Sequence, residues 1–188
     1  LIKTRNPKHS WTNASWNTGV KLATQPYIAV LNSDITLNSN WDEYLMETLE
    51  EAMIACPFER RGNEIFGLYD IHKKVHPEMI KGSCFMFKRE DIYCLFPIPS
   101  ELTHWCGDHF LADQATWYVT LNDFRAPVKF DRRAIITHKS SSSGRLINEE
   151  EYNKVIKEDV LNYQKMSNRD MKPILEAVFG NSSRGESS

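Results

Sequence analysis

A short apolar segment that ends abruptly in polar residues constrains the fold of this chain more than any other feature. The segment reads YIAVLNSD, from Tyr27 to Asp34. Its first five residues are typical of a buried strand in a sheet. A strand that presents a carboxylate at its C-terminal tip is a common way for α/β enzymes to hold a metal ion beside a phosphate. The same pattern also fits a strand followed by an ordinary turn, in which Asp34 caps the next element.

The residues around this strand predict an alternation of helices and strands. Ser10 or Thr12 can cap a helix that runs to about Ala23, and apolar residues at helical spacing predict a second helix over 41–55, with Ser39 or Asn40 as its N-cap. Further helices are expected over 89–95, 107–121, 148–166 and 169–179, and further strands over 64–69, 79–88, 126–130 and 134–138. Such alternation favours a layered α/β domain with a partly parallel sheet.

Composition limits the classes of function. The 188 residues, 41% of them apolar, suffice for one domain over 1–180, and the Ser-rich tail 181–188 is expected to be disordered. A net charge of -2 gives no basic excess for a nucleic-acid partner. No apolar run reaches the roughly 20 residues of a transmembrane helix, and no signal peptide is visible. We therefore expect a soluble, cytoplasmic protein.

The cysteines give no sign of a metal cluster or a redox motif. The four of them lie at irregular spacings with no CxxC pair: Cys56, Cys84, Cys94 and Cys106. Buried free thiols in a reducing compartment are the expected state. The five tryptophans are expected to be mostly core, and Phe110, Leu111, Ala115, Trp117 and Tyr118 to form the core face of the 107–121 helix.

Three segments, the first of which includes the strand described above, match the motifs of a known family and come in the same order as in that family. Residues 16–34, WNTGVKLATQPYIAVLNSD, follow the pattern Asn-x-Gly-x-x-x-Ala-x-x-x-Tyr-Ile-x-x-Leu-x-x-Asp, residues 81–89 read KGSCFMFKR, and residues 105–109 read WCGDH. A histidine, His138, follows the last expected strand. Together these segments resemble the sugar-nucleotide-dependent glycosyltransferases of GT-A fold, most closely inverting family 2. The resemblance covers roughly residues 6–143.

The resemblance implies a three-layer, Rossmann-like α/β fold with a mixed central sheet, of the nucleotide-diphospho-sugar transferase type. It further implies a UDP- or GDP-linked sugar donor, a glycan or other hydroxyl acceptor, and Mn²⁺ or Mg²⁺ held by Asp34 and His138. The cation would stabilise the negative charge that develops on the diphosphate leaving group. For His138, a satisfied core or surface histidine is the other interpretation.

The resemblance also implies a catalytic base. Inversion needs a group that takes the proton from the acceptor hydroxyl, and the match assigns this role to Asp108. The other interpretation of Asp108 is a carboxylate that merely stabilises a helix N-terminus. Trp105 and His109 are candidate acceptor contacts; for Trp105 the reason is that an aromatic ring packs well on the apolar face of a sugar. For His109, a structural role is the other interpretation.

The remaining candidates would bind the nucleotide or the donor sugar: Asn6, Trp11, Asn13, Asn32, Ser33, Gly82, Ser83 and Arg145. The 140–143 serine run, next to Arg145, is either a loop that closes over the diphosphate or a plain linker. The chain departs from the family pattern at Asn32, which replaces an Asp, and at Gly107, which replaces a Glu. Family members have about three strands before the Asn-x-Gly helix, and almost nothing corresponds to them here. Either that part is left out of this chain, so that the 1–180 domain is incomplete at its N-terminus, or the domain is abbreviated.

Two other classes of function are consistent with these residues. A nucleotidyltransferase also uses a carboxylate at a strand end with a metal, but it usually has a Gly-rich basic loop near its start, and none is visible. An inactive relative that only binds sugar nucleotides would keep the same pattern without turnover. The leading hypothesis is a metal-dependent inverting glycosyltransferase.

Overall fold

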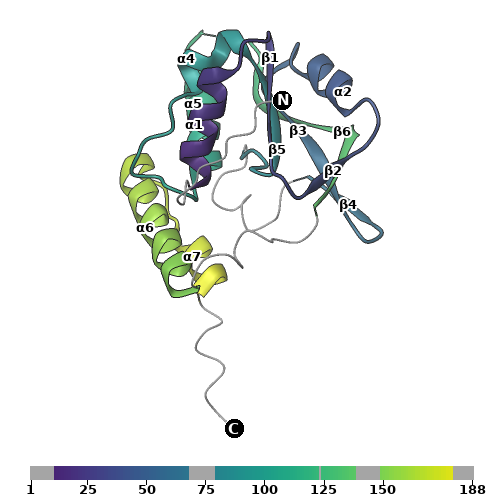
Figure 1. Ribbon diagram of the computed structural model, residues 1–188. Helices are drawn as coiled ribbons and strands as arrows, with labels where there is room; N and C mark the ends of the chain where they lie inside the picture. The colour runs from purple at the N-terminus through teal and green to yellow at the C-terminus, as the bar shows by residue number, and fades with distance from the viewer. Residues whose placement is uncertain (1–10, 68–78, 123, 139–148, 180–188) are drawn as a thin grey trace.

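The computed structural model describes residues 11–67, 79–122, 124–138 and 149–179 (Figure 1). Several predicted features lie outside these described residues, namely Asn6, Arg145, the 140–143 serine run and the tail 181–188.

A mixed sheet lies at the centre of the fold. Its strands are β1 (Tyr27–Leu31), β2 (Ile35–Leu37), β3 (Ala52–Arg61), β4 (Glu64–Phe66), β5 (Cys84–Lys88) and β6 (Ala126–His138). The order across the sheet is β1-β5-β3-β6-β2, and β4 pairs with β3. The β3 and β6 strands run parallel, whereas the other pairs are antiparallel. The expected mixed α/β sheet is therefore confirmed.

Helices cover both faces of this sheet. They are α1 (Thr12–Leu22), α2 (Trp41–Thr48), the 3-10 turn η1 (Arg89–Asp91), α4 (Ile92–Leu95), α5 (Gly107–Asn122), α6 (Glu149–Ser167) and α7 (Lys172–Phe179). Figure 1 shows α1, α4 and α5 on one side of the sheet and α2 on the other. The larger core cluster joins apolar residues of α1, α5 and α6 to β1, β3 and β5, while Leu45 and Leu49 pack on the opposite face. Three layers result.

The predicted helix over 41–55 is correct in its first half and wrong in its second. The helix ends at Thr48, and Ala52 begins β3, the central strand between β5 and β6. Residues 52–56 are all fully buried, because a strand inside a sheet is covered on both faces. Such a continuous apolar run has no period of two, so its sequence does not distinguish it from a buried helix.

Other boundaries also differ. The two strands expected over 126–130 and 134–138 are one strand, β6, whose pairing with β3 shifts register between Pro57 and Phe58. The short strand β2 was not predicted. The strand expected over 79–88 begins at Cys84, and β4 ends at Phe66.

Helix capping agrees with the expectation at α2 and differs from it at α1. Asn40, one of the two expected residues, occupies the N-cap of α2, whereas Trp11 occupies that of α1; neither side chain makes a capping hydrogen bond. Trp117 lies on the surface with 64% of its area exposed, so it is not a core residue of α5.

The expectation of free cysteines holds. All four are unpaired, with Cys56, Cys84 and Cys106 buried and Cys94 partly buried. Burial raises the pKa of the Cys56 thiol to about 12, so that it stays protonated at neutral pH. Within the described residues, no helix combines the length and the apolar character that crossing a bilayer requires.

Candidate functional site

A pocket of about 310 Å³ brings together six of the predicted site residues. They are Asn32, Gly82, Ser83, Trp105, Asp108 and His138. These residues come from the end of β1, the turn before β5, the start of α5 and the end of β6. Glu59, Arg61, Met79, Ile80 and Lys81 complete the lining. Asp34 is not in this lining but contacts His138 from beside it. We call Asn32, His138 and the adjacent Asp34 the strand-end side, and Trp105 and Asp108 the helix side.

On the strand-end side, Asp34 and His138 are in direct contact although 104 positions separate them. The Nε2 atom of His138 lies 3.1 Å from Oδ1 of Asp34, and both side chains are largely buried. The unpredicted strand β2 explains this contact, since it pairs with β6 and places Ile35 opposite His138. Asp34 is therefore fixed one residue from the register partner of His138.

The donor atoms of this pair suit a divalent cation. A carboxylate oxygen and an imidazole nitrogen are both ligands of Mn²⁺, and carboxylate oxygen is also preferred by Mg²⁺. No group of three or more His, Cys, Asp or Glu side chains that could hold a metal is found in the described part of the chain. The donor atoms of Asp34 and His138 thus fit a divalent cation, with two ligands from the described part of the chain.

The turn before β5 connects the two sides of the pocket. The backbone N–H of Asn32 donates to the carbonyl of Ser83 at 2.9 Å, which ties the end of β1 to this turn. The Ser83 hydroxyl is buried and has no hydrogen-bond partner among the described residues. A Cβ at Gly82 would lie 3.0 Å from Oδ2 of Asp108, so glycine lets the carboxylate approach the turn. Ser33 is exposed and does not line the pocket.

On the helix side, Asp108 lies in the first turn of α5. Its Oδ1 accepts a hydrogen bond from the backbone N–H of His109 at 3.0 Å and lies 3.1 Å from Nδ1 of the same residue. About a quarter of the Asp108 side chain is exposed (24%), whereas His109 is 2% exposed and packs against Tyr163. The structure thus places His109 behind Asp108 and outside the pocket lining, which does not suit an acceptor contact.

Two predicted nucleotide contacts instead hold the loop that precedes α5. Asn13 is buried and donates from Nδ2 to the carbonyls of Leu102 and Trp105, at 2.9 and 3.1 Å. Trp11 packs against the ring of His104. Neither side chain lines the pocket.

The contacts of Asn13 also explain why glycine stands where the family pattern has a glutamate. A Cβ at Gly107 would lie 2.2 Å from Oδ1 of Asn13, a distance that no side chain tolerates. The preceding residue, Cys106, has a φ of 60°, a left-handed conformation that is uncommon for a residue with a side chain. The loop therefore enters α5 through a tight and locally strained turn.

Sequence reasoning missed three charged residues of the pocket wall. Lys81 Nζ lies 3.0 Å from Oε2 of Glu59, and Arg61 Nε lies 2.7 Å from Oε1 of the same carboxylate. Glu59 and Lys81 are almost completely buried (2% and 5% exposed), whereas Arg61 is 56% exposed. Recognising residues 52–61 as a strand would have placed Glu59 and Arg61 on one face of it.

The pKa values of this group follow from its burial and its charges. Burial opposes the ionised form of Glu59, but hydrogen bonds and positive charge from Arg61 and Lys81 outweigh it and lower the pKa of the carboxyl. Burial also lowers the pKa of Lys81, and Glu59 counteracts this only in part. The lowered pKa of Glu59 favours its charged form, whereas the lowered pKa of Lys81 disfavours its charged form. Both shifts can occur in one pair, because Glu59 has two cationic neighbours while Lys81 is repelled by Arg61.

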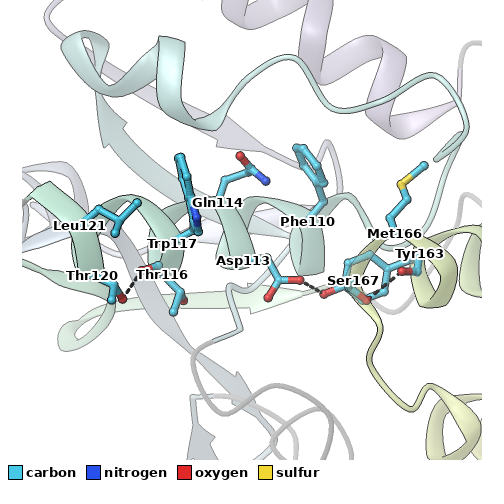
Figure 2. Close-up of a pocket in the computed structure, with 10 residues that line it drawn as sticks. All are labelled: Phe110, Asp113, Gln114, Thr116, Trp117, Thr120, Leu121, Tyr163, Met166 and Ser167. Carbon is cyan, nitrogen blue, oxygen red and sulfur yellow. Dashed lines mark hydrogen bonds between the residues drawn. The ribbon is translucent and has the colours of Figure 1, made fainter.

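A second pocket, of about 480 Å³, lies between α5 and α6 and contains none of the predicted site residues. Figure 2 shows Phe110, Gln114 and Trp117 on one side of α5, while Asp113 points to Tyr163. Tyr163 donates to Asp113, and the guanidinium of Arg169 also binds this carboxylate. Burial and the contact with Asp113 raise the pKa of Tyr163. The titratable groups of this pocket thus serve to hold α5 and α6 together.

Comparison with known proteins identifies the family. The model of the family described as Glycosyl transferase family 2 matches residues 1–103, which is more than half of the 188 residues. No curated protein matches the chain. The matched region contains β1, Asp34 and the turn before β5, and ends just before Trp105 and Asp108. The chain belongs to glycosyl transferase family 2 and is a glycosyltransferase.

Proposed function

We propose that the protein is a metal-dependent, inverting glycosyltransferase that moves a sugar from a UDP- or GDP-linked donor to a hydroxyl acceptor. One observation carries the proposal: a single pocket has Asp108 on one side and His138, paired with Asp34, on the other. A group that accepts a proton and a group that can hold a cation at the leaving diphosphate are the two that such a transfer needs.

The strand-end side would receive the diphosphate. A divalent cation held there by Asp34 and His138 would supply positive charge to the leaving group. Asn32 and the buried hydroxyl of Ser83 lie beside this position and can hydrogen-bond the donor. Asn32 brings no charge where family members have a carboxylate, so the protein itself places one carboxylate, Asp34, at this tip.

The helix side would receive the acceptor. Asp108 would take the proton from the attacking hydroxyl, because its carboxylate is partly exposed to the pocket and anchored by the backbone of α5. Trp105 lines the same side and offers an aromatic surface to a sugar ring. Gly82 keeps the space between Asp108 and the donor position open.

The test is transfer from UDP-glucose, UDP-N-acetylglucosamine and GDP-mannose with Mn²⁺, Mg²⁺ or chelator, followed by release of the nucleoside diphosphate. NMR of the anomeric proton of the product distinguishes inversion from retention. Asp108→Asn is expected to reduce kcat by about 10²- to 10⁴-fold. Retention of configuration, turnover unaffected by chelator, or full activity of Asp108→Asn would each refute the corresponding part of the proposal.

Asp42→Asn is the matched control for Asp108→Asn. Asp42 is an exposed carboxylate in the first turn of α2, so the same substitution there removes only a helix-terminal charge. Equal small effects of the two substitutions would mean that Asp108 acts merely as a helix-terminal carboxylate. Tight, metal-dependent binding of UDP without turnover of any donor would point to an inactive sugar-nucleotide-binding relative.

A further inference from the structure

The loop over residues 102–106 carries Trp105 and leads directly into Asp108, and α6 holds it through one buried carboxylate. We propose that Asp159 of α6 is a positioning residue for the helix side of the pocket. It fixes the backbone of residues 103–105 and thereby sets where Trp105 and Asp108 stand. This inference rests on the proposed function, because it concerns the geometry of the same site.

Asp159 has no exposed surface and accepts four hydrogen bonds from the loop. Its Oδ1 binds the backbone N–H and the hydroxyl of Thr103, at 2.9 and 2.8 Å. Its Oδ2 binds the backbone N–H groups of His104 and Trp105, both at 2.7 Å. Three consecutive backbone donors thus converge on one carboxylate, an arrangement that fixes the course of the chain there.

Trp105 is held from two directions. Its backbone N–H donates to the carboxylate of Asp159 in α6, and its backbone carbonyl accepts from the side-chain amide of Asn13 in α1. The next residue, Cys106, adopts its left-handed conformation between this anchor and α5. A non-glycine residue remains in such a conformation only where the surrounding contacts determine it.

The attachment of α6 to the core does not require a carboxylate at this position. Ile156, Val160 and Tyr163 of α6 are buried in the main core cluster and supply the apolar contacts. Burying a charged group is costly unless hydrogen bonds satisfy it, and here the loop provides them. Asp159 therefore acts by holding the backbone of residues 103–105 and is not needed to attach α6 to the core. It also makes α6, which lies beyond the matched residues 1–103, part of the site.

Asp159→Asn is the sharpest variant because it keeps the shape of the side chain. An amide has one acceptor oxygen, so its NH₂ group would face backbone donors that it cannot satisfy. We expect hydrogen exchange of the peptide spanning residues 102–106 to become about tenfold faster or more. We expect kcat to fall by about tenfold or more, since small displacements of catalytic groups are costly. Binding of UDP with Mn²⁺, monitored by calorimetry, should stay within about twofold of wild type, because the strand-end side is untouched.

Val160→Ala is the matched control from the adjacent position of α6. It removes core contacts and lowers the unfolding midpoint, but it should leave loop exchange and kcat within about twofold of wild type when assayed well below that midpoint. An equal loss of kcat in Val160→Ala would reduce the role of Asp159 to general stability and overturn the inference.

Thr103→Val serves if Asp159→Asn does not fold. It removes one of the four hydrogen bonds and should accelerate loop exchange and lower kcat, each by about twofold to fivefold. Wild-type loop exchange and wild-type kcat in either folded variant would overturn the inference.

If Asp108→Asn abolishes transfer while Asp159→Asn does not alter it, the proposed function stands and this inference fails. If Asp108→Asn retains full transfer, the proposed function fails instead.

Discussion

The two sides of the pocket are built by different means. On the strand-end side, strand pairing alone brings the two candidate ligands together, since the register of β2 with β6 places Asp34 beside His138. On the helix side, a loop outside any helix or strand is held by side chains of α1 and α6, through Asn13 and Asp159. The first arrangement uses contacts that any sheet makes, whereas the second depends on individual hydrogen bonds.

This difference separates the two kinds of work that the pocket would do. A cation that binds a flexible diphosphate tolerates some variation in ligand position, because water and phosphate oxygens complete its coordination. A base must lie within hydrogen-bond distance of one particular hydroxyl. The helix side, where a base would need the more exact position, is also the side with more hydrogen bonds that fix its backbone.

The largest effects on catalysis and binding are expected when one acid on each side is replaced. Asp108→Asn should lower kcat by about 10²- to 10⁴-fold and leave metal-dependent UDP binding unchanged. Asp34→Asn should instead weaken UDP binding in the presence of Mn²⁺ by about tenfold or more, as measured by calorimetry, because a charged ligand is lost. If both variants show the same combination of kcat and binding, the assignment of separate roles to the two sides is wrong.

The buried ion pair of Glu59 and Lys81 in the pocket wall gives the largest expected effect on stability. Glu59→Gln leaves the buried ammonium of Lys81 without its carboxylate and should lower the free energy of unfolding in urea by about 3–5 kcal/mol. Arg61→Ala, at an exposed partner of the same carboxylate, should cost less than about 1 kcal/mol. Glu59→Leu combined with Lys81→Met should recover most of the loss. A Glu59→Gln variant as stable as wild type would show that the pair does not stabilise the pocket wall.

Gly107→Ala tests whether the turn that leads into α5 on the helix side is as tight as the structure shows. Alanine normally favours a helix over glycine by about 1 kcal/mol, yet here its Cβ would meet the Asn13 amide. We expect the substitution to lower the free energy of unfolding by about 1–3 kcal/mol, as overpacking does. Thermal unfolding of the variant, with Asn13→Ala/Gly107→Ala as the relieved control, measures the effect. A more stable Gly107→Ala variant would contradict the tight turn.

The smallest expected effect concerns pH. Burial lowers the pKa of His104 below its ordinary value of 6.5, although the negative charges of Asp159 and Asp108 counteract this. Below pH 6.5 the unfolded chain therefore binds a proton that the folded protein does not, and the free energy of unfolding decreases as the pH falls. Urea unfolding between pH 7.5 and 5 should show a flatter profile for His104→Gln. An unchanged slope would mean that His104 does not contribute to the pH dependence.

Much of the strand-end side could be predicted from the sequence. The apolar run before Asp34 and the one before His138 each indicate a strand that ends in a polar side chain, and the structure has β1 and β6 at these places. Local periodicity sufficed there, because each feature lies within one short segment. The role of Asn13 was not predictable in this way, since the carbonyls that it contacts lie on a loop about 90 positions away.

The alternation of helices and strands, the glycosyltransferase pattern and about half of the residues that line the pocket follow from the sequence. Tertiary structure decided that residues 52–61 form the central strand, that Glu59 meets Lys81, and that Asp159 holds the loop before Asp108. The physical reason is that a buried strand and a buried charge are stabilised by partners that are distant along the chain. The type of residue shows that a buried charge needs a partner, and only the folded chain shows which partner it has.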